Sequence, residues 1–489
     1  MENLTEENIR IIFGMKVKKL RNDHQLSLQQ LSEKSGISVS YLNEIENGKK
    51  YPKTDKINDL AKALSVSYDQ LVSLKLAKNM AHIGQFLSLD IVNDFLFQTF
   101  GIDKSTLLAM VASEPIRVSA FINAIYEIAR NYNLKQEHFY FMCLRSYQEL
   151  NQNYFEDIED AVDRFREENQ LDEKEILTPE RYEALLKKLF GYHIRSTDFK
   201  DYPKLKEMRS VFVKGEKPLL QYNKKLTAQQ KAFLFGRELG FNYLKLDKRP
   251  YTTPWLRFGS FDNVLNNFRA SYFAQALHIP KTGLKKDLEN IFGADRFNPN
   301  FIAHLLEKYS ASPEMLLTRI SNILPMYFGI DELFFIRYSS KESSKTLKEI
   351  SKELHLTKHN LQLEYTISEQ NYRRWLTKSV LKYLLKEKGK DAMKIDAVIT
   401  ENGNGNRYLT ISILREMPEL NNNNNSVTLG FVLNDAALKK IRFVNDKKLD
   451  VAKLGDLSEN EFDEPVELKR LKELEAREEE FERMRNEIG

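Results

Sequence analysis

The stretch "FGRELGF", from Phe235 to Phe241, combines residue types and a spacing that could support metal chemistry. On a helix, positions 237 and 241 lie one turn apart on one face, which is the spacing at which the His-Glu-x-x-His motif binds zinc. Here those positions hold Arg237 and Phe241. Because arginine keeps its proton at any usable pH and phenylalanine has no lone pair, neither can bind a metal. Glu238 would then have no metal-bound water to deprotonate, so we predict neither a metal site nor a catalytic residue.

A helix has to position these side chains. Thr227 and Gln230 form a capping-box pattern, and apolar or small residues follow at helical spacing as far as Leu244. The pattern therefore predicts a helix that begins at Thr227 and carries Arg237 and Glu238. Two interpretations of these two side chains remain open: an ordinary, partly buried salt bridge between them, or a small anionic effector bound beside Arg237.

A different pattern near the N-terminus predicts a compact run of short helices. Ser27 is a good N-cap for one helix, Gly36 allows the turn that ends it, and Ser38 caps the next. Leu42 and Ile45 would hold that second helix to the domain. A helix, a tight turn and a second capped helix at this spacing form a helix-turn-helix, whose second helix can enter the major groove of DNA.

Short or polar side chains at the start of the second helix can reach base edges, and basic residues beyond it can reach phosphates. The candidates of both kinds are Ser38, Ser40, Tyr41, Asn43, Glu44, Lys49 and Lys50. The alternative is a helix-turn-helix that is retained for protein contacts alone.

This region closely resembles the Cro/C1-type repressors, also called the XRE family, over about 65 residues that include "IENGKKYPKTDKINDLAKAL". The resemblance implies that Val39, Ser40 and Glu44 face bases. It also implies that Gln29 and Asn47 position the DNA backbone. By the same resemblance we expect a homodimer on double-stranded operator DNA, with half-sites about one helical turn (~34 Å) apart.

The bulk composition bounds the remaining possibilities. At 489 residues the chain is too long for one core, and two to four domains are expected. A net charge of +4 excludes a histone-like binder, and the single cysteine excludes an intramolecular disulfide. The N-terminus lacks the positive charge of a signal peptide, and no run of about 18 apolar residues follows. We therefore expect a cytoplasmic protein without membrane contact.

We predict an α+β protein with an all-α N-terminal domain, a helical middle segment, a mixed α/β domain and a sheet-containing C-terminal region. Strand signals are clearest in "LFFIRY", "RYLTISIL" and "SVTLGFVL", with the run Asn421–Asn425 as a hairpin loop. The predicted segments are the helix-turn-helix domain at 1–76, a helical connector or dimerisation region at 77–172, the α/β domain at 173–330, a C-terminal sensor region at 331–455 and a charged helical tail at 456–489.

Residues 180–330 resemble the ImmA/IrrE-type domain, in "RASYFAQALHIP" and "EKYSASPEMLLTRISNI" as well as around Glu238. With "LRSYQELNQNYFEDIE", "YRRW" and "SVTLGFVLNDAALKKIRFVND", the chain also resembles the short-chain fatty acyl-coenzyme A regulators. This implies a zincin-like domain without zinc that serves as a sensor. Several relatives have cysteines proposed to hold an iron–sulfur cluster, but Tyr372 replaces one and the C-terminal part has none, so no cofactor is expected.

An acyl-coenzyme A needs cations for its phosphates and an apolar slot for its acyl chain. The effector-binding candidates are Arg209, Lys214, Lys217, Arg237 and Tyr272. The alternative interpretation is that they are surface cations and a core aromatic residue. We therefore expect a transcription regulator, not an enzyme, whose C-terminal part senses a metabolite and sets operator binding. The alternatives are a residual or zinc-independent peptidase that acts on a partner repressor, and an antitoxin-type or immunity-type interaction protein.

Overall fold

The computed structural model describes residues 6–73, 136–172, 174–199, 208–253, 260–339, 349–356, 373–374, 376–377, 393–401, 407–415, 425–446, 449 and 451–452. The chain divides into two units. The first contains the N-terminal residues as far as Tyr140 together with Ser260–Asp262, and the second contains the rest. Each unit is described by itself.

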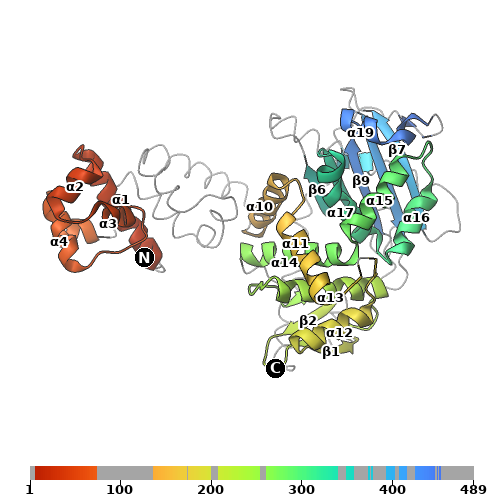
Figure 1. Ribbon diagram of the computed structural model, residues 1–489, viewed down its shortest axis with the longest axis horizontal. Coiled ribbons are helices and arrows are strands. Elements are labelled where there is room, and N and C mark those ends of the chain that lie inside the picture. Colours follow the sequence, from red (N-terminus) through yellow and green to blue (C-terminus); the bar gives the residue numbers. More distant parts are fainter. Residues whose placement is uncertain are drawn as a thin grey trace. The chain divides into compact units, whose positions relative to one another are not determined.

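Five helices form residues 6–73 of the N-terminal unit (Figure 1): α1 (Glu6–Asp23), α2 (Leu28–Ser35), α3 (Val39–Glu46), α4 (Thr54–Ala63) and α5 (Tyr68–Val72). Local sequence explains where they begin and end. Ser27 caps α2 in a full capping box with Gln30, and Gly36 ends it with a φ of +67°, which a residue with a side chain rarely adopts.

The core of this unit consists of one apolar face from each helix. Its buried residues are Phe13, Val17, Leu31, Ile37, Leu42, Ile45, Ile57, Leu60, Ala61, Leu64 and Leu71. Helices α1 and α3 approach so closely that a Cβ added to Gly14 would lie 2.3 Å from the carbonyl oxygen of Ile45. Glycine at position 14 therefore allows α1 to lie directly on the backbone of α3.

The described residues of the second unit form two sheets. The smaller one has the strand order β1-β3-β2-β4, with β1 and β3 parallel and the other pairs antiparallel. Its strands are β1 (His193–Thr197), β2 (Ser210–Val213), β3 (Leu219–Asn223) and β4 (Thr252–Thr253). Helices α11 (Glu156–Glu168), α12 (Pro179–Phe190), α13 (Ala228–Tyr243) and α14 (Phe261–His278) share a core with these strands, in which Phe165, Tyr182, Leu220, Phe235 and Phe273 are buried.

The larger sheet has six strands in the order β10-β7-β8-β9-β5-β6, antiparallel except for the pair β10 and β7. The strands are β5 (Leu333–Ser339), β6 (Glu349–Leu356), β7 (Met393–Glu401), β8 (Arg407–Arg415), β9 (Asn425–Val432) and β10 (Val451–Ala452). Helices α15 (Lys281–Phe292), α16 (Pro299–Lys308) and α17 (Pro313–Ile323) cover one face of it (Figure 1).

Strand β8 confirms the alternation expected of "RYLTISIL". Leu409, Ile411 and Ile413 point into the core beneath α15–α17. The intervening Thr410 and Ser412 are also buried, however, so both faces of the strand are covered. The hydroxyl groups of Ser412 and Thr428 lie 2.8 Å apart across β8 and β9, which satisfies polar groups that would otherwise be costly to bury.

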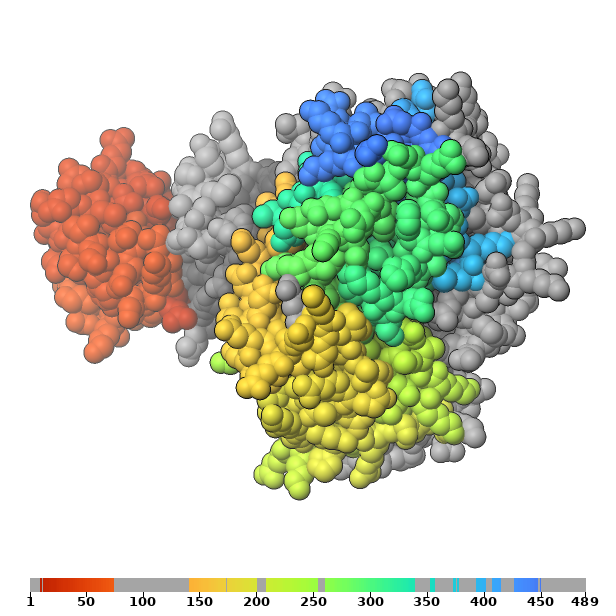
Figure 2. All heavy atoms as spheres, turned by 45° about the vertical axis from the view of Figure 1, so that its right-hand side comes forward, coloured from red at the N-terminus to blue at the C-terminus, as the bar shows by residue number. Residues whose placement is uncertain are grey.

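The fold class is α+β, as predicted. Residues coloured orange to green, from α11 to α17, form one continuous surface in the space-filling view (Figure 2). Because α15–α17 share their core with the large sheet, the boundary expected at residue 330 would separate helices from the strands on which they pack. Most of the predicted connector, most of the Asn421–Asn425 loop, position 372 and the helical tail at 456–489 lie outside the described residues.

Candidate functional site

The second helix of the predicted helix-turn-helix is α3, and its attachment to the domain is fixed by local chemistry. The Ser38 hydroxyl accepts a hydrogen bond from the backbone N–H of Tyr41 at 3.3 Å, which caps the helix. Leu42 and Ile45 are fully buried on the inner face. The outer face is thereby presented by a helix that cannot rotate without exposing both residues.

The structure brings the predicted DNA contacts together on and around this helix. Six are exposed: Gln29, Ser38, Ser40, Asn43, Lys49 and Lys50. Four are half-buried: Val39, Tyr41, Glu44 and Asn47. The side chain of Asn47 donates to Asn43 Oδ1 at 2.9 Å, so two of the predicted contacts also orient each other.

An ion pair that the sequence pattern does not reveal fixes the end of α3. Arg21, on α1, donates from Nε and Nη2 to the two carboxylate oxygens of Glu46, at 2.7 and 2.9 Å. Its third nitrogen donates to the carbonyl of Leu26 at 2.8 Å. Glu46 is 3% exposed, so this bidentate pair lies inside the domain. The two residues are 25 positions apart, and no local motif connects them.

Helix α13 carries the "FGRELGF" stretch, and its capping box at Thr227 and Gln230 is present as predicted. Arg237, Glu238 and Phe241 are 6%, 1% and 2% exposed. Among the described residues there is no group of three His, Cys, Asp or Glu side chains that could hold a metal ion. The two charged residues of the stretch therefore belong to the interior of the protein.

The salt bridge of Glu238 is made with Arg249, which follows α13, and not with Arg237 as one interpretation of the sequence held. Arg249 Nη2 lies 2.5 Å from Glu238 Oε2, and the hydroxyl of Tyr192 donates to the same oxygen at 3.0 Å. Burial lowers the pKa of Arg249, but Glu238 and Tyr192 outweigh it, and the net shift is upward. Arg249 is therefore a charged group that is ion-paired with Glu238, although its buried Nε has no hydrogen-bond acceptor.

Two aromatic rings hold Arg249 in place. Its guanidinium carbon lies 3.9 Å from the ring centre of Phe212 and 4.1 Å from that of Phe241, which is cation–π distance on both sides. Phe241 thus occupies the second metal-ligand position of the motif, and its ring forms one side of the site that holds Arg249. Neither Arg249 nor Tyr192 is marked by the sequence, because each is brought to α13 by the fold alone.

Arg237 has different partners. Its Nη2 lies 2.5 Å from the hydroxyl of Thr253 on β4, and its Nη1 donates to Asn267 Oδ1 on α14 at 3.4 Å. The pKa of Arg237 is lowered to about 10, chiefly by burial; nearby Glu238 opposes this shift, and the positive charges of Arg249 and Arg209 add to it. The group remains charged at neutral pH.

The other predicted effector residues are spread over the second unit. Arg209 is exposed next to Thr253, since its backbone N–H donates to the Thr253 carbonyl at 2.6 Å. Lys214 and Lys217 are exposed beyond the far end of β2, about five residues or ~16 Å along the strand from Arg209. The structure therefore brings Arg209 and Arg237 together, but not the two lysines.

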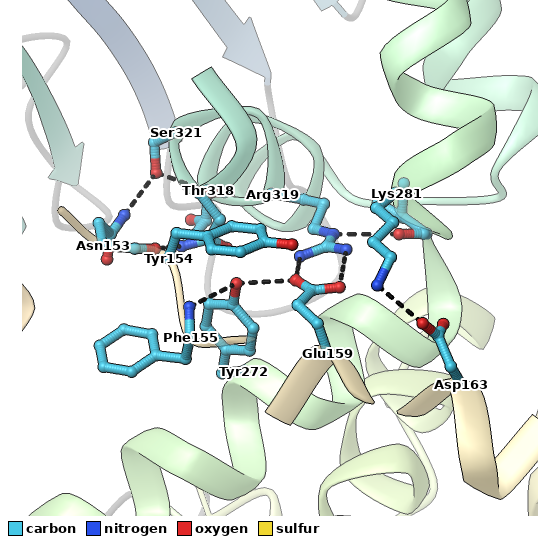
Figure 3. A network of polar contacts seen from close by, with 12 residues as sticks. Asn153, Tyr154, Phe155, Glu159, Asp163, Tyr272, Lys281, Thr318, Arg319 and Ser321 are labelled. Carbon is cyan, nitrogen blue, oxygen red and sulfur yellow. Dashed lines mark hydrogen bonds and ion pairs between the residues drawn. The ribbon is translucent and has the colours of Figure 1, made fainter. Parts of the chain in front are cut away.

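Tyr272 is part of a buried network (Figure 3). Its hydroxyl donates to Glu159 Oε1 at 2.7 Å and accepts from the backbone N–H of Phe155 at 3.3 Å. Glu159 also accepts hydrogen bonds from Arg319, whose Nη1 lies 2.5 Å from Oε1 and whose Nη2 lies 2.9 Å from Oε2. With 2% of its surface exposed and both hydrogen bonds satisfied, Tyr272 is a structural residue in this conformation.

None of the helices in the described part of the chain combines the length and apolar character needed to cross a bilayer.

Among solved structures, a Mycobacterium tuberculosis transcriptional regulator is similar at 17% identity, covering 65% of this chain and 92% of that one, with a TM-score of 0.44. A TM-score below 0.5 does not establish a common fold, and this likeness supports no conclusion.

The N-terminal unit has clear relatives. The helix-turn-helix family matches residues 17–71. Over 61 residues the chain is 39% identical to the HTH-type transcriptional repressor RghR of Bacillus subtilis, which covers 12% of this chain and 45% of RghR. The chain thus spans less than half the length of that relative. Over 66 residues it is 32% identical to the HTH-type transcriptional regulator y4dJ of Sinorhizobium fredii, covering 14% of this chain and 86% of y4dJ. Through its N-terminal domain, the chain belongs to the family of HTH-type transcriptional regulators.

Proposed function

We propose that this protein regulates transcription by binding a specific operator in double-stranded DNA through α3. One observation carries the proposal: a capped helix is held by Leu42 and Ile45 while Ser40 and Asn43 stand exposed on its outer side. Hydroxyl and amide groups are suited to base edges in the major groove, and Val39 offers an apolar surface for a thymine methyl group.

The lysines that follow α3 supply the second part of the interaction. Lys49 and Lys50 are exposed, and their backbone N–H groups donate to the carbonyl of Glu44 at 2.9 and 3.3 Å. This turn keeps both side chains close to the C-terminal end of the helix. We assign them to the DNA phosphates, with Gln29 and Asn47 positioning the backbone and Glu44 facing a base.

We further propose that the protein acts in the cytoplasm as a homodimer, without enzymatic activity, and that its second unit senses a metabolite. The chain's resemblance to acyl-coenzyme A regulators supports an acyl-coenzyme A as that effector. An effector changes operator affinity only by binding one arrangement of the dimer more tightly than the other. The residues assigned to it are Arg209, Lys214, Lys217 and Arg237, and Tyr272 as a core residue that would have to rearrange.

The test is a DNA retardation assay on the promoter of the protein's own gene, with and without a panel of acyl-coenzyme A esters. The double variant Ser40→Ala, Lys49→Ala is expected to lose specific affinity by about 10- to 1,000-fold and to show a smaller salt dependence, since one base contact and one phosphate contact are removed. Lys62→Ala, which changes an exposed lysine at the end of α4, is the matched control.

Unchanged specific binding and an unchanged salt slope in the double variant would show that α3 is not the recognition helix. If binding is specific but no ester alters it, the DNA-binding part of the proposal stands and the acyl-coenzyme A part fails. Stoichiometric zinc bound to the purified protein through α13 would instead indicate a peptidase.

A further inference from the structure

Arg237 combines burial with an incomplete set of partners. A guanidinium group has five N–H donors, and in this structure Arg237 uses one for Thr253 and one for Asn267. Its Nε is buried and has no hydrogen-bond acceptor. Three donors are therefore unused, one on each nitrogen, which is enough for a bidentate contact with a planar or tetrahedral oxyanion.

The surrounding charges do not balance. The positive charges of Arg249 and Arg209 lower the pKa of Arg237, and one carboxylate, that of Glu238, raises it. Arg209 also lies near the charges of Arg337 and Glu314. Arg249 is already bonded to that carboxylate at 2.5 Å. Among the described residues no carboxylate forms a hydrogen bond or ion pair with Arg237, so its positive charge lies in the interior without a directly bonded counter-charge.

The groups around Arg237 extend from this interior position to the surface. Thr253 and Asn267 are half-buried, and Arg209 is exposed next to Thr253. The Thr253 hydroxyl accepts from Arg237 and keeps its own proton to donate, and the amide group of Asn267 has donors as well. A solute that reaches these two side chains thus meets hydrogen-bond donors and positive charge.

Arg237 differs from a typical buried charge in having only neutral hydrogen-bond partners. Buried charges in proteins are normally paired, because an isolated charge is costly to remove from water. The ring of Phe241 lies 5.9 Å from the Arg237 guanidinium carbon, at the outer limit of a cation–π contact, and offers little compensation. Neutral partners and a distant ring do not replace a counter-ion.

We propose that Arg237, Thr253 and Asn267 form a binding site for an oxyanion, the carboxylate or phosphate group of a small metabolite. The oxyanion supplies the missing counter-charge and receives the unused donors of Arg237, while Arg209 attracts it from solvent. The site deepens the metabolite sensing proposed above and rests on it for its regulatory meaning, but the binding itself does not involve DNA.

The test is calorimetric titration of the full-length protein with sodium phosphate and, separately, with sodium propionate, at an ionic strength kept constant with chloride. We expect saturable binding of at least one probe to the wild type. In Arg237→Met the affinity should fall about 10- to 100-fold, because a charged bidentate contact is lost. Asn267→Ala should show a smaller loss, and Arg237→Lys should retain part of the affinity.

Arg195→Ala is the matched control, since Arg195 is an exposed arginine on β1, at the opposite edge of the small sheet from β4. It should bind as the wild type does. Thermal unfolding of each variant shows whether it is folded. The preference for propionate or phosphate identifies the head group as carboxylate or phosphate.

Equal titrations of wild type and Arg237→Met, or no binding of either probe up to tens of millimolar, would overturn the site. Neither result touches DNA binding, which the retardation assay reports independently. Conversely, the wild type could bind a probe through Arg237 while its operator affinity is the same with and without the probe. In that case the oxyanion site stands and the proposed metabolite control fails.

Discussion

Two arginines of the second unit, Arg319 and Arg237, both carry a positive charge in the interior, but their partners differ. Arg319 is 0% exposed, and both of its terminal nitrogens donate hydrogen bonds to the Glu159 carboxylate. Its Nε donates to the carbonyl of Ile279 at 3.0 Å. Arg237 is nearly as buried but has two neutral partners and an Nε without an acceptor. The charge of Arg319 is neutralised by an ion pair within the fold, whereas Arg237 has no bonded carboxylate among the described residues.

The two arginines differ in what each substitution would leave behind in the interior. The pair of Arg319 and Glu159 joins α17 to α11, and Tyr272 adds a third element, α14 (Figure 3). Removing one partner of such a pair exposes the other to the full cost of burial. Removing Arg237 deletes a charge that forms no ion pair with a carboxylate in the described part of the chain.

The largest expected effect follows from breaking the balanced pair. Arg319→Met should lower the free energy of unfolding by about 3–5 kcal/mol, because Glu159 is left as an uncompensated buried carboxylate. Arg237→Met, the matched substitution at the unbalanced site, should leave stability unchanged or raise it. Urea denaturation followed by circular dichroism measures both. Equal destabilisation by the two substitutions would remove the distinction between the two arginines.

The pH dependence of this effect sharpens the comparison. In the wild type, burial raises the pKa of Glu159, but Arg319 and Tyr272 outweigh it, so the pKa is lowered from 4.5. This carboxylate therefore contributes stability above about pH 4.5 that is lost as the pH falls through its folded-state pKa. Without Arg319, burial should raise the pKa, and protonation should then stabilise the folded state.

The destabilisation caused by Arg319→Met should accordingly be greatest at neutral pH and should shrink as the pH falls below about 5. Denaturation curves of wild type and variant between pH 4 and 8 provide the measurement. A difference that is constant over this range would mean that the charge of Glu159 does not cause it.

The smallest expected effect lies at the rim of the same network. Lys281 Nζ lies 2.7 Å from Asp163 Oδ2, but the Asp163 side chain is 58% exposed. Because water screens such pairs, Lys281→Ala should change the free energy of unfolding by less than about 1 kcal/mol. An effect as large as that of Arg319→Met would show that the rim, and not the buried pair, carries the energy.

Local sequence predicted the elements whose causes are local. The caps at Ser38 and Thr227 depend on residues three positions away, and both helices begin where the patterns placed them. The strand alternation of β8 and the buried run of β5 were equally readable. The α+β class followed from these elements.

What the sequence did not predict depends on tertiary contacts. The partner of Glu238 is Arg249, eleven positions away beyond the end of α13, and not the adjacent Arg237. Glu159 and Arg319 are 160 positions apart. Spacing along a helix says which side chains share a face, whereas packing against β4 and α14 decides which of them receives a counter-charge.

The contacts of Arg249 with Phe212 and Phe241 limit what substitutions in α13 could achieve. Histidines at positions 237 and 241 would create the spacing of a zinc motif, yet Arg249 would still pair with Glu238 and would lose its contact with the ring of Phe241. A cation fixed at that place also repels a second one. At least three substitutions, at positions 237, 241 and 249, would be needed before this helix could bind a metal, and no single substitution reaches that state.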